Sequence, residues 1–212
     1  MKKLDTSLYF ITDSTGCDEY SFLEKIESAL NGGVTILQLR EKNKTTREYI
    51  NLAEKVHKIT VKYNVPLIID DRIDVAMAVN AEGVHLGQDD MPIDTARKIL
   101  GDNMIIGATT KTTQQAAQAC KNGADYLGVG AIYPTTTKVK TVLTSVDTLK
   151  AICESVSIPV NAIGGLNKDN IHILKGTGIS GICAVSAIMK SSNAQTAAEE
   201  LKTAAEGLGI IK

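Results

Sequence analysis

The chain of 212 residues contains no tryptophan, and aromatic residues make up only 4% of it. Proteins that bind single-stranded nucleic acid stack the bases on aromatic side chains, so this composition disfavours that class. Charge of either sign is not in excess, because 23 lysines and arginines face 24 aspartates and glutamates and the net charge is −1. General binding to nucleic acid or to anionic membranes relies on a surplus of positive charge. We therefore expect no nucleic-acid partner and no membrane partner.

Paired cysteines and long apolar runs are also missing. Cys17, Cys120, Cys153 and Cys183 lie far apart and form no Cys-x-x-Cys pair, so nothing indicates a zinc site or a redox motif. We expect reduced, structural cysteines, with Cys183 buried in an apolar run. No run approaches the length of a membrane span, and the apolar residues 8–11 are too few for the core of a secretion signal. The expected location is the cytoplasm.

What the sequence does contain is a regular alternation of short apolar runs with longer amphipathic segments. Residues 23–30 and 49–63, for example, carry apolar side chains at helical spacing. Strands that alternate with helices predict a parallel sheet, and a hydrophobic content of 43% is enough to build its core. The expected strands are residues 8–11, 34–39, 66–69, 83–86, 104–107, 126–129, 158–163 and 179–185.

Eight strand–helix units in about 200 residues predict an α/β fold of the (β/α)8 type, a TIM barrel. An open doubly wound sheet is the alternative. Such a sheet usually carries a G-x-G-x-x-G motif after its first strand, but residues 13–16 read DSTG. No linker or low-complexity stretch divides the chain, so we expect a single barrel domain over residues 1–212.

In a barrel of this kind the active site lies at the carboxyl ends of the strands. The second expected strand ends in the segment QLREK, residues 38–42. Alternate residues of a strand share a side, so Gln38, Arg40 and Lys42 should point together. Two cations and an amide suit an anionic ligand. The alternative is a solvated charge cluster at the start of a helix.

Two pairs of aspartates follow the next two strands, Asp70 with Asp71 and Asp89 with Asp90. Neighbouring parallel strands lie about 4.8 Å apart, so these carboxylates should share one small volume. Carboxylates beside cations suit Mg²⁺, which is usually held by one or two carboxylates together with substrate phosphates and water. The alternative is that one aspartate of each pair caps the following helix.

Two further segments suit phosphate. The sixth strand is followed by GAIYPTTTK, residues 130–138, a loop that can close over an anion. The alternative is a flexible polar loop with no ligand. Paired glycines at 164–165 follow the seventh strand, and a helix is expected to start at 185–186, where backbone N–H groups can bind phosphate. A cationic site and a backbone site imply two substrates, one a diphosphate and one a monophosphate. Transfer of the group on the diphosphate to the second substrate fits this layout.

Taken together, these segments strongly resemble the thiamine-phosphate synthase family, also called thiamine-phosphate pyrophosphorylase. The resemblance covers almost the whole chain. It implies Mg²⁺-dependent joining of 4-amino-2-methyl-5-pyrimidinylmethyl diphosphate to 4-methyl-5-(2-phosphoethyl)thiazole, or its carboxylated form, with release of diphosphate. Asp70 departs from the asparagine frequent in the family, and Thr109 from the more usual serine. The matching segments are 38–42 (QLREK), 68–72 (IIDDR), 85–90 (HLGQDD), 130–138 (GAIYPTTTK), 162–165 (AIGG) and 184–188 (AVSAI).

The resemblance also implies a set of residues for each ligand. Asp71 and Asp90 are expected to hold Mg²⁺, and Arg40, Lys42, Thr109 and Lys138 to take part in catalysis. The residues expected to bind the pyrimidine diphosphate are Gln38, Arg40, Lys42, Asp70, Thr109 and Lys138. Those expected to bind the thiazole phosphate are Thr135, Thr136, Thr137, Gly165, Val185 and Ser186.

Two other functions stay open. A thiazole tautomerase has the same fold but needs neither the metal carboxylates nor the diphosphate lysine, and their presence favours the synthase. A non-catalytic sensor of a phosphorylated ligand is the other alternative. Among the histidines, His57 and His172 are expected at the surface and His85 in a structural role, with no Ser-His-Asp or Cys-His arrangement. The oligomeric state is left open, a homo-oligomer included.

Overall fold

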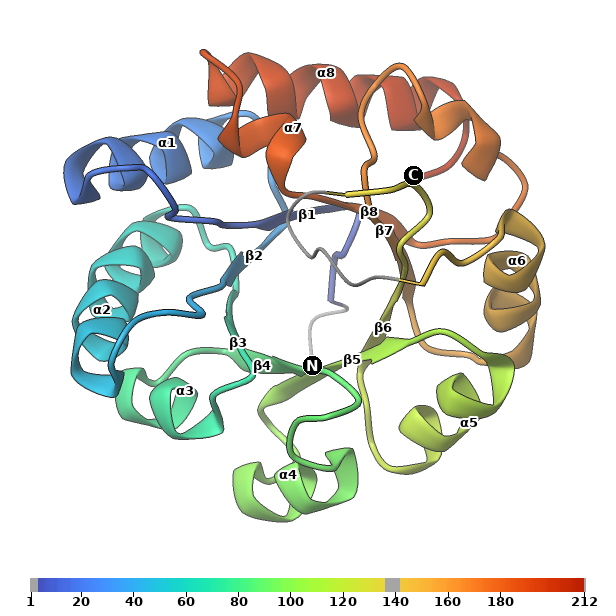
Figure 1. Ribbon diagram of the computed structural model, residues 1–212, viewed down its shortest axis with the longest axis horizontal. Coiled ribbons are helices and arrows are strands. Elements are labelled where there is room, and N and C mark those ends of the chain that lie inside the picture. The colour runs from blue at the N-terminus through green and yellow to red at the C-terminus, as the bar shows by residue number, and fades with distance from the viewer. Residues whose placement is uncertain (1–3, 136–141, 212) are drawn as a thin grey trace.

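The computed structural model describes residues 4–135 and 142–211. Its parallel strands follow one another around a closed barrel, in which β8 pairs with β1 (Figure 1). The expected (β/α)8 barrel is therefore confirmed, and the open doubly wound sheet is not formed. The strands are β1 (Leu8–Ile11), β2 (Ile36–Leu39), β3 (Leu67–Asp70), β4 (Gly83–Leu86), β5 (Ile105–Thr110), β6 (Tyr126–Gly130), β7 (Val160–Ile163) and β8 (Gly181–Ala184).

Helices surround the barrel, but not in eight equal units. Between β7 and β8 the chain makes only a 3₁₀ turn, η1 (Ile171–Leu174), and β8 is followed by two helices. None of the described helices combines the length and the apolar character that crossing a bilayer takes. The helices are α1 (Glu19–Asn31), α2 (Thr46–Lys62), α3 (Ile73–Val79), α4 (Ile93–Leu100), α5 (Thr113–Lys121), α6 (Val146–Ser155), α7 (Ser186–Met189) and α8 (Ala194–Gly207).

Side-chain caps fix where the first two helices begin. The carboxylate of Asp18 accepts a hydrogen bond from the amide of Ser21 at the start of α1. At the start of α2, Thr45 and Glu48 form a reciprocal capping box. Each cap satisfies backbone N–H groups that have no partner inside the helix. Both helices consequently begin about one turn before the amphipathic segments expected from the sequence.

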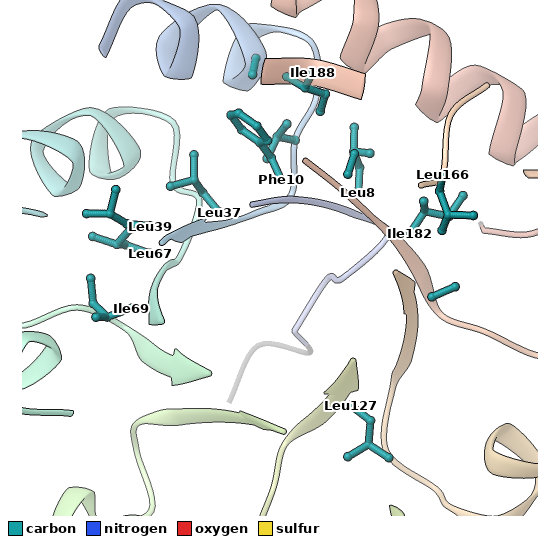
Figure 2. Close-up of a cluster of buried hydrophobic side chains, with 14 of the residues drawn as sticks. Leu8, Phe10, Leu37, Leu39, Leu67, Ile69, Leu127, Leu166, Ile182 and Ile188 are labelled. Carbon is teal, nitrogen blue, oxygen red and sulfur yellow. The ribbon is translucent and has the colours of Figure 1, made fainter. Parts of the chain in front are cut away.

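The larger part of the core lies between the strands and the helices. Outward-facing side chains of successive strands form it, such as Leu37 and Leu39 of β2 beside Leu67 and Ile69 of β3 (Figure 2). All four are fully buried. Successive residues of a strand point to opposite faces of the sheet. Because these residues face the helices, their neighbours in each strand point into the barrel.

A second, smaller cluster fills the inside of the barrel. It includes Tyr9, Ile11, Ile36, Ile68 and Tyr126, together with Cys183. The strand register places Tyr9 of β1 opposite Ile36 of β2 and Cys183 of β8. The predicted burial of Cys183 is thus confirmed, and all four cysteines are free thiols. The interior cluster forms the floor of the cavity described next.

Candidate active site

A cavity of about 310 Å³ opens at the carboxyl ends of the strands and receives side chains or backbone from all eight of them. This size is in the range of small-molecule sites. Three residues expected in the site, Thr136, Thr137 and Lys138, lie outside the described residues. Every other residue expected there lines the cavity: Gln38, Arg40, Lys42, Asp70, Asp71, Asp90, Thr109, Thr135, Gly165, Val185 and Ser186.

On the β2–β3 side of the cavity, cations and carboxylates form one cluster. The ammonium of Lys42 lies 2.7 Å from Oδ2 of Asp70 and donates a hydrogen bond to Asp71. The guanidinium of Arg40 lies 3.8 Å from the same oxygen of Asp70. The alternative of a solvated charge cluster holds only for Lys42, which is exposed, because Gln38 is buried and Arg40 is half-buried. An anionic substrate arriving here meets two cations that are already held in place.

Burial dominates the chemistry of Asp70. It raises the pKa of this carboxyl to about 6, helped by the neighbouring charge of Asp71, and the cations of Lys42 and Arg40 offset only part of the effect. Asparagine, which the resemblance leads one to expect at this position, would avoid that electrostatic cost. The ionised form of Asp70 is therefore a source of instability in the metal-free protein.

We expect Asp70→Asn to raise the thermal midpoint of the metal-free protein at pH 8. The pKa of Asp70 in the folded state lies above its ordinary value of 3.8, so ionisation costs free energy that the unfolded chain does not incur. That cost begins above about pH 4 and is complete well above about pH 6, so the gain should disappear as the pH falls through this window. Thermal unfolding in excess chelator between pH 4 and pH 8 measures it. The matched control is Asp94→Asn on α4, and an undiminished gain at pH 4 would contradict the expectation.

Asp71 and Asp90 face each other across the ends of β3 and β4. Asp71 has a positive φ of 61°, an unusual conformation for a residue other than glycine, and its amide donates to the carbonyl of His85. Oδ2 of Asp90 accepts a hydrogen bond from the amide of Gly87 at 2.7 Å. Burial raises the pKa of Asp90, as do the hydrogen bond with Asp71 and the charge of that residue. Two facing carboxylates, one of which raises the pKa of the other, indicate a position for a cation.

Neither aspartate caps a helix, so the helix-capping alternative is wrong. The starts of α3 and α4 receive no side-chain hydrogen bond. Within residues 4–135 and 142–211, no group of three or more histidine, cysteine or acidic side chains is arranged for a metal. A pair of carboxylates with room for substrate oxygens fits Mg²⁺, which seldom has a cage made of protein ligands alone. The residues present therefore fit the ion that the resemblance implies.

The backbone side of the cavity lies at β7 and β8. Gly164 and Gly165 both have positive φ values, 110° and 63°. A Cβ on Gly165 would lie 2.8 Å from Cβ of Tyr133 and 2.9 Å from the carbonyl of Pro134. Glycine is thus required at this position by the approach of the β6 loop. Helix α7 begins at Ser186, as expected, and no side chain caps its start.

We expect Gly165→Val to raise the KM for the thiazole phosphate at least about tenfold, because both the positive φ and the loop contact must give way. Ser186→Ala should change the same KM by less than about threefold, since the backbone N–H groups supply most of the binding. Steady-state kinetics with the thiazole varied, together with circular dichroism to check folding, measure both. Equal effects of the two substitutions would contradict a backbone site.

Several residues of the cavity carry no motif, and sequence reasoning missed them. Tyr9, Ile11, Lys111 and Ile163 line it. Cys183, expected only as a buried hydrophobe, lines it as well. The available signal was strand alternation, because Tyr9 and Ile11 share a side of β1, but without a register the inward side was unknown.

A chain of hydrogen bonds crosses the barrel below the cavity. The amide of Gln38 donates to the hydroxyl of Tyr9 at 2.7 Å, and this hydroxyl lies 2.7 Å from that of Tyr126. The hydroxyl of Tyr126 lies 3.1 Å from Nδ1 of His85, whose Nε2 lies 2.9 Å from Oγ1 of Thr109. Thr109 was expected just after its strand but lies inside β5. The chain of bonds joins two residues expected at the pyrimidine.

The other two histidines differ from each other. His57 is half-buried, and its ring nitrogens bond the carbonyl of Val79 and the carboxylate of Glu82 at 3.1 and 3.0 Å. The expectation of a surface position is therefore wrong for His57, which ties α2 to the start of β4. His172 is exposed, as expected.

Comparison with known proteins agrees with this geometry. A family described as thiamine monophosphate synthase matches residues 8–188. Thiamine-phosphate synthase 2 of Streptococcus pneumoniae is 53% identical, over 88% of this chain and 89% of the relative. Thiamine-phosphate synthase of Methanobrevibacter smithii is 50% identical, over 95% and 96%.

A solved structure is similar as well. Thiamine phosphate pyrophosphorylase of Pyrococcus furiosus superposes with a TM-score of 0.87 at 41% identity, over 97% of this chain and 98% of that one. A 3-hexulose-6-phosphate synthase, at 17% identity and a TM-score of 0.72, shares the fold alone. Matches of this extent, over a site that holds the expected residues, place the chain in the thiamine monophosphate synthase family.

Proposed function

We propose that this synthase transfers the pyrimidinylmethyl group of 4-amino-2-methyl-5-pyrimidinylmethyl diphosphate to the nitrogen of 4-methyl-5-(2-phosphoethyl)thiazole or its carboxylated form. The products are thiamine phosphate and diphosphate. The observation that carries the proposal is the pairing of two unlike anion sites in one cavity. Cations and carboxylates lie at β2 to β4, and an uncapped helix start with paired glycines lies at β7 and β8.

Arg40 and Lys42 would bind the diphosphate and stabilise the negative charge that grows on it as it leaves. Both already lie against Asp70, so little ordering is needed when the substrate arrives. Lys138, expected to add a third cation, lies outside the described residues. Thr135, which lines the cavity, would contact the thiazole phosphate together with the backbone at Gly165, Val185 and Ser186.

Asp71 and Asp90 would hold Mg²⁺ beside the cluster of cations and carboxylates at the ends of β2 and β3. When bound, the ion supplies positive charge that offsets both carboxylates and the diphosphate. Tyr9, Tyr126 and Cys183 of the interior cluster below are at most 2% exposed, so this side of the cavity would keep water from the reacting carbon. A site with these properties favours departure of a charged group.

The alternatives use less of the site. A thiazole tautomerase would use only the β7 and β8 side, and a sensor would need no carboxylate pair. The raised pKa values of Asp70 and Asp90 show that their ionised forms cost electrostatic free energy, and a function that ignores these carboxylates gives no reason for that cost.

Release of diphosphate tests the proposal. Purified protein with Mg²⁺ and both substrates should release one diphosphate for each thiamine phosphate formed, and omission of the thiazole should suppress both products. A tautomerase would isomerise the thiazole phosphate alone, and a sensor would bind a ligand with no turnover. Either of those results would contradict the proposal.

A further inference from the structure

One direction lets every group in the hydrogen-bond chain inside the barrel both donate and accept, and the amide of Gln38 sets it. The amide N–H of Gln38 donates to Tyr9, so the hydroxyl hydrogen of Tyr9 is available for Tyr126. The hydroxyl of Tyr126 can then donate to Nδ1 of His85. A neutral imidazole has one N–H, which must in that case lie on Nε2 and point at Oγ1 of Thr109. The hydroxyl hydrogen of Thr109 is left to donate elsewhere.

Burial keeps the two tyrosines of this chain neutral. Tyr9 is 1% exposed, Tyr126 is fully buried, and Gln38 is 2% exposed. Burial raises the pKa of both tyrosine hydroxyls well above the ordinary value, so neither ionises in the working range. A buried polar group that loses its partner costs about 1–3 kcal/mol, so reversing one bond forces the others to reverse. The two ends of the chain are therefore coupled.

The two ends present opposite hydrogen-bonding groups. One of the two N–H groups of the Gln38 amide is held by Tyr9, so the amide cannot flip without losing that bond. Its carbonyl oxygen therefore stays in place as an acceptor, and Thr109 offers a hydroxyl donor. Both residues line the cavity on the side expected to hold the pyrimidine. A 4-aminopyrimidine has an amino donor and ring-nitrogen acceptors, which match this polarity. A 4-oxopyrimidine places a carbonyl where the amino group was, so two acceptors would face each other.

We propose that Tyr9, Tyr126 and His85 are positioning residues that select a 4-amino over a 4-oxo pyrimidine by fixing Gln38 as an acceptor and Thr109 as a donor. The inference extends the proposed function of this site. It gives a role to three residues within strands, and it explains why polar groups are buried inside the barrel where apolar side chains usually pack. Rejection then comes from a mismatched polar contact, which discriminates more strongly than shape.

The direction of the hydrogen-bond chain can be determined in the protein without ligand, because it sets the tautomer of His85. Nitrogen-15 NMR of labelled imidazoles distinguishes the two neutral tautomers, and a His85→Gln spectrum assigns the signal. We expect the N–H of His85 on Nε2. An N–H on Nδ1 would overturn the proposal, whatever the enzyme catalyses. The result does not depend on turnover, so it separates this inference from the proposed function, which the diphosphate assay tests.

Selectivity is measured by competition with two unreactive ligands, the 4-amino and 4-oxo forms of 2-methyl-5-hydroxymethylpyrimidine monophosphate. The ratio of their inhibition constants should be about 100 in the unmodified enzyme. In Tyr126→Phe the hydroxyl of Tyr9 loses its partner, so it can donate to the oxygen of a flipped Gln38 amide, and His85 can change tautomer. Gln38 is then no longer held as an acceptor, and Thr109 is no longer held as a donor. The ratio should then fall to about 10.

Tyr49→Phe is the matched control. Tyr49 is as buried as Tyr9, but its hydroxyl donates to backbone carbonyls, that of Leu39 at 2.6 Å and that of Asp70 at 3.4 Å, and to no member of the hydrogen-bond chain. This variant should keep the ratio near 100 even if it loses stability. An unchanged ratio in Tyr126→Phe, or an equal fall in Tyr49→Phe, would overturn the proposal.

Discussion

A trifluoromethyl group in place of the 2-methyl group of the pyrimidine diphosphate should slow a single turnover by roughly two orders of magnitude or more. The expected reaction is dissociative: the diphosphate leaves, a pyrimidinylmethyl cation remains, and the thiazole nitrogen captures it. An electron-withdrawing substituent destabilises that cation, and each 1.36 kcal/mol on the barrier slows the step about tenfold. Rapid-quench measurement with enzyme in excess isolates the chemical step. A rate indifferent to the substituent would contradict the mechanism.

The described part of the cavity explains why attack by the protein is not expected. The thiol of Cys183 lines the cavity, but burial raises its pKa far above the ordinary value, so it stays protonated and weakly nucleophilic. Thr109 lies within hydrogen-bonding distance of a histidine, as an activated nucleophile would. The polarity proposed above puts the proton of His85 on Nε2, facing Thr109, so this imidazole cannot accept the proton of Thr109.

Two variants check this point. Cys183→Ala and Thr109→Val should both react without a covalent intermediate, and Cys183→Ala should retain most of its rate. Mass spectrometry of enzyme quenched during turnover detects any attached pyrimidine. A pyrimidinylmethyl adduct on either side chain of the unmodified enzyme would replace the dissociative mechanism with a covalent one.

The sequence predicted the part of the site that follows the strands. Charged and glycine-rich segments such as 38–42 and 164–165 interrupt apolar runs, and the rule that active sites lie at carboxyl ends puts them together. The barrel register then brings Lys42 to Asp70 and Asp71 although these residues are far apart in the chain. The local sequence pattern and one rule of barrel topology were sufficient to predict that these residues lie together in the cavity.

The hydrogen-bond chain inside the barrel could not be predicted in the same way. Tyr9 and Tyr126 are separated by 117 positions in the sequence. Each lies in an apolar strand, where an aromatic residue is predicted to pack in the hydrophobic core. Their hydroxyl groups meet only because both strands point these side chains inward, which depends on register and closure. The mistake over His57 has the same origin, since its two partners belong to other elements.

The seventh unit shows another limit of periodicity. The sequence suggested a helix after every strand, but η1 is a single 3₁₀ turn. Here Asn170 fixes the loop, its side chain donating to the carbonyl of Gly165 and accepting from the amide of Asn167. The β6 loop is tied to the paired glycines by a separate bond, from the amide of Tyr133 to the carbonyl of Gly164 at 3.0 Å. The backbone site therefore depends on loop contacts, which helical spacing in the sequence does not reveal.

Removing the charge of Asp90 should lower kcat/KM by roughly two orders of magnitude or more. Asp90→Asn retains an oxygen that can accept from Gly87, so the local turn should persist. The variant loses half of the carboxylate pair that would hold Mg²⁺, and a diphosphate beside an uncompensated Asp71 is repelled. Kinetics over a range of Mg²⁺ concentrations, with excess chelator as the zero point, measure the effect.

Stability provides a second readout that does not depend on turnover. The pKa of Asp90 is raised in the folded protein, so its ionised form opposes folding at neutral pH, and Asp90→Asn should raise the thermal midpoint when chelator is present. Added Mg²⁺ should stabilise the unmodified protein through binding to the folded state and stabilise the variant much less. Asp94→Asn removes the same charge from the exposed first turn of α4, where its carboxylate lies 3.8 Å from Lys98, and should behave like the unmodified protein. Full activity of the unmodified enzyme in excess chelator, or equal stabilisation of Asp90→Asn by Mg²⁺, would remove Asp90 from the metal site.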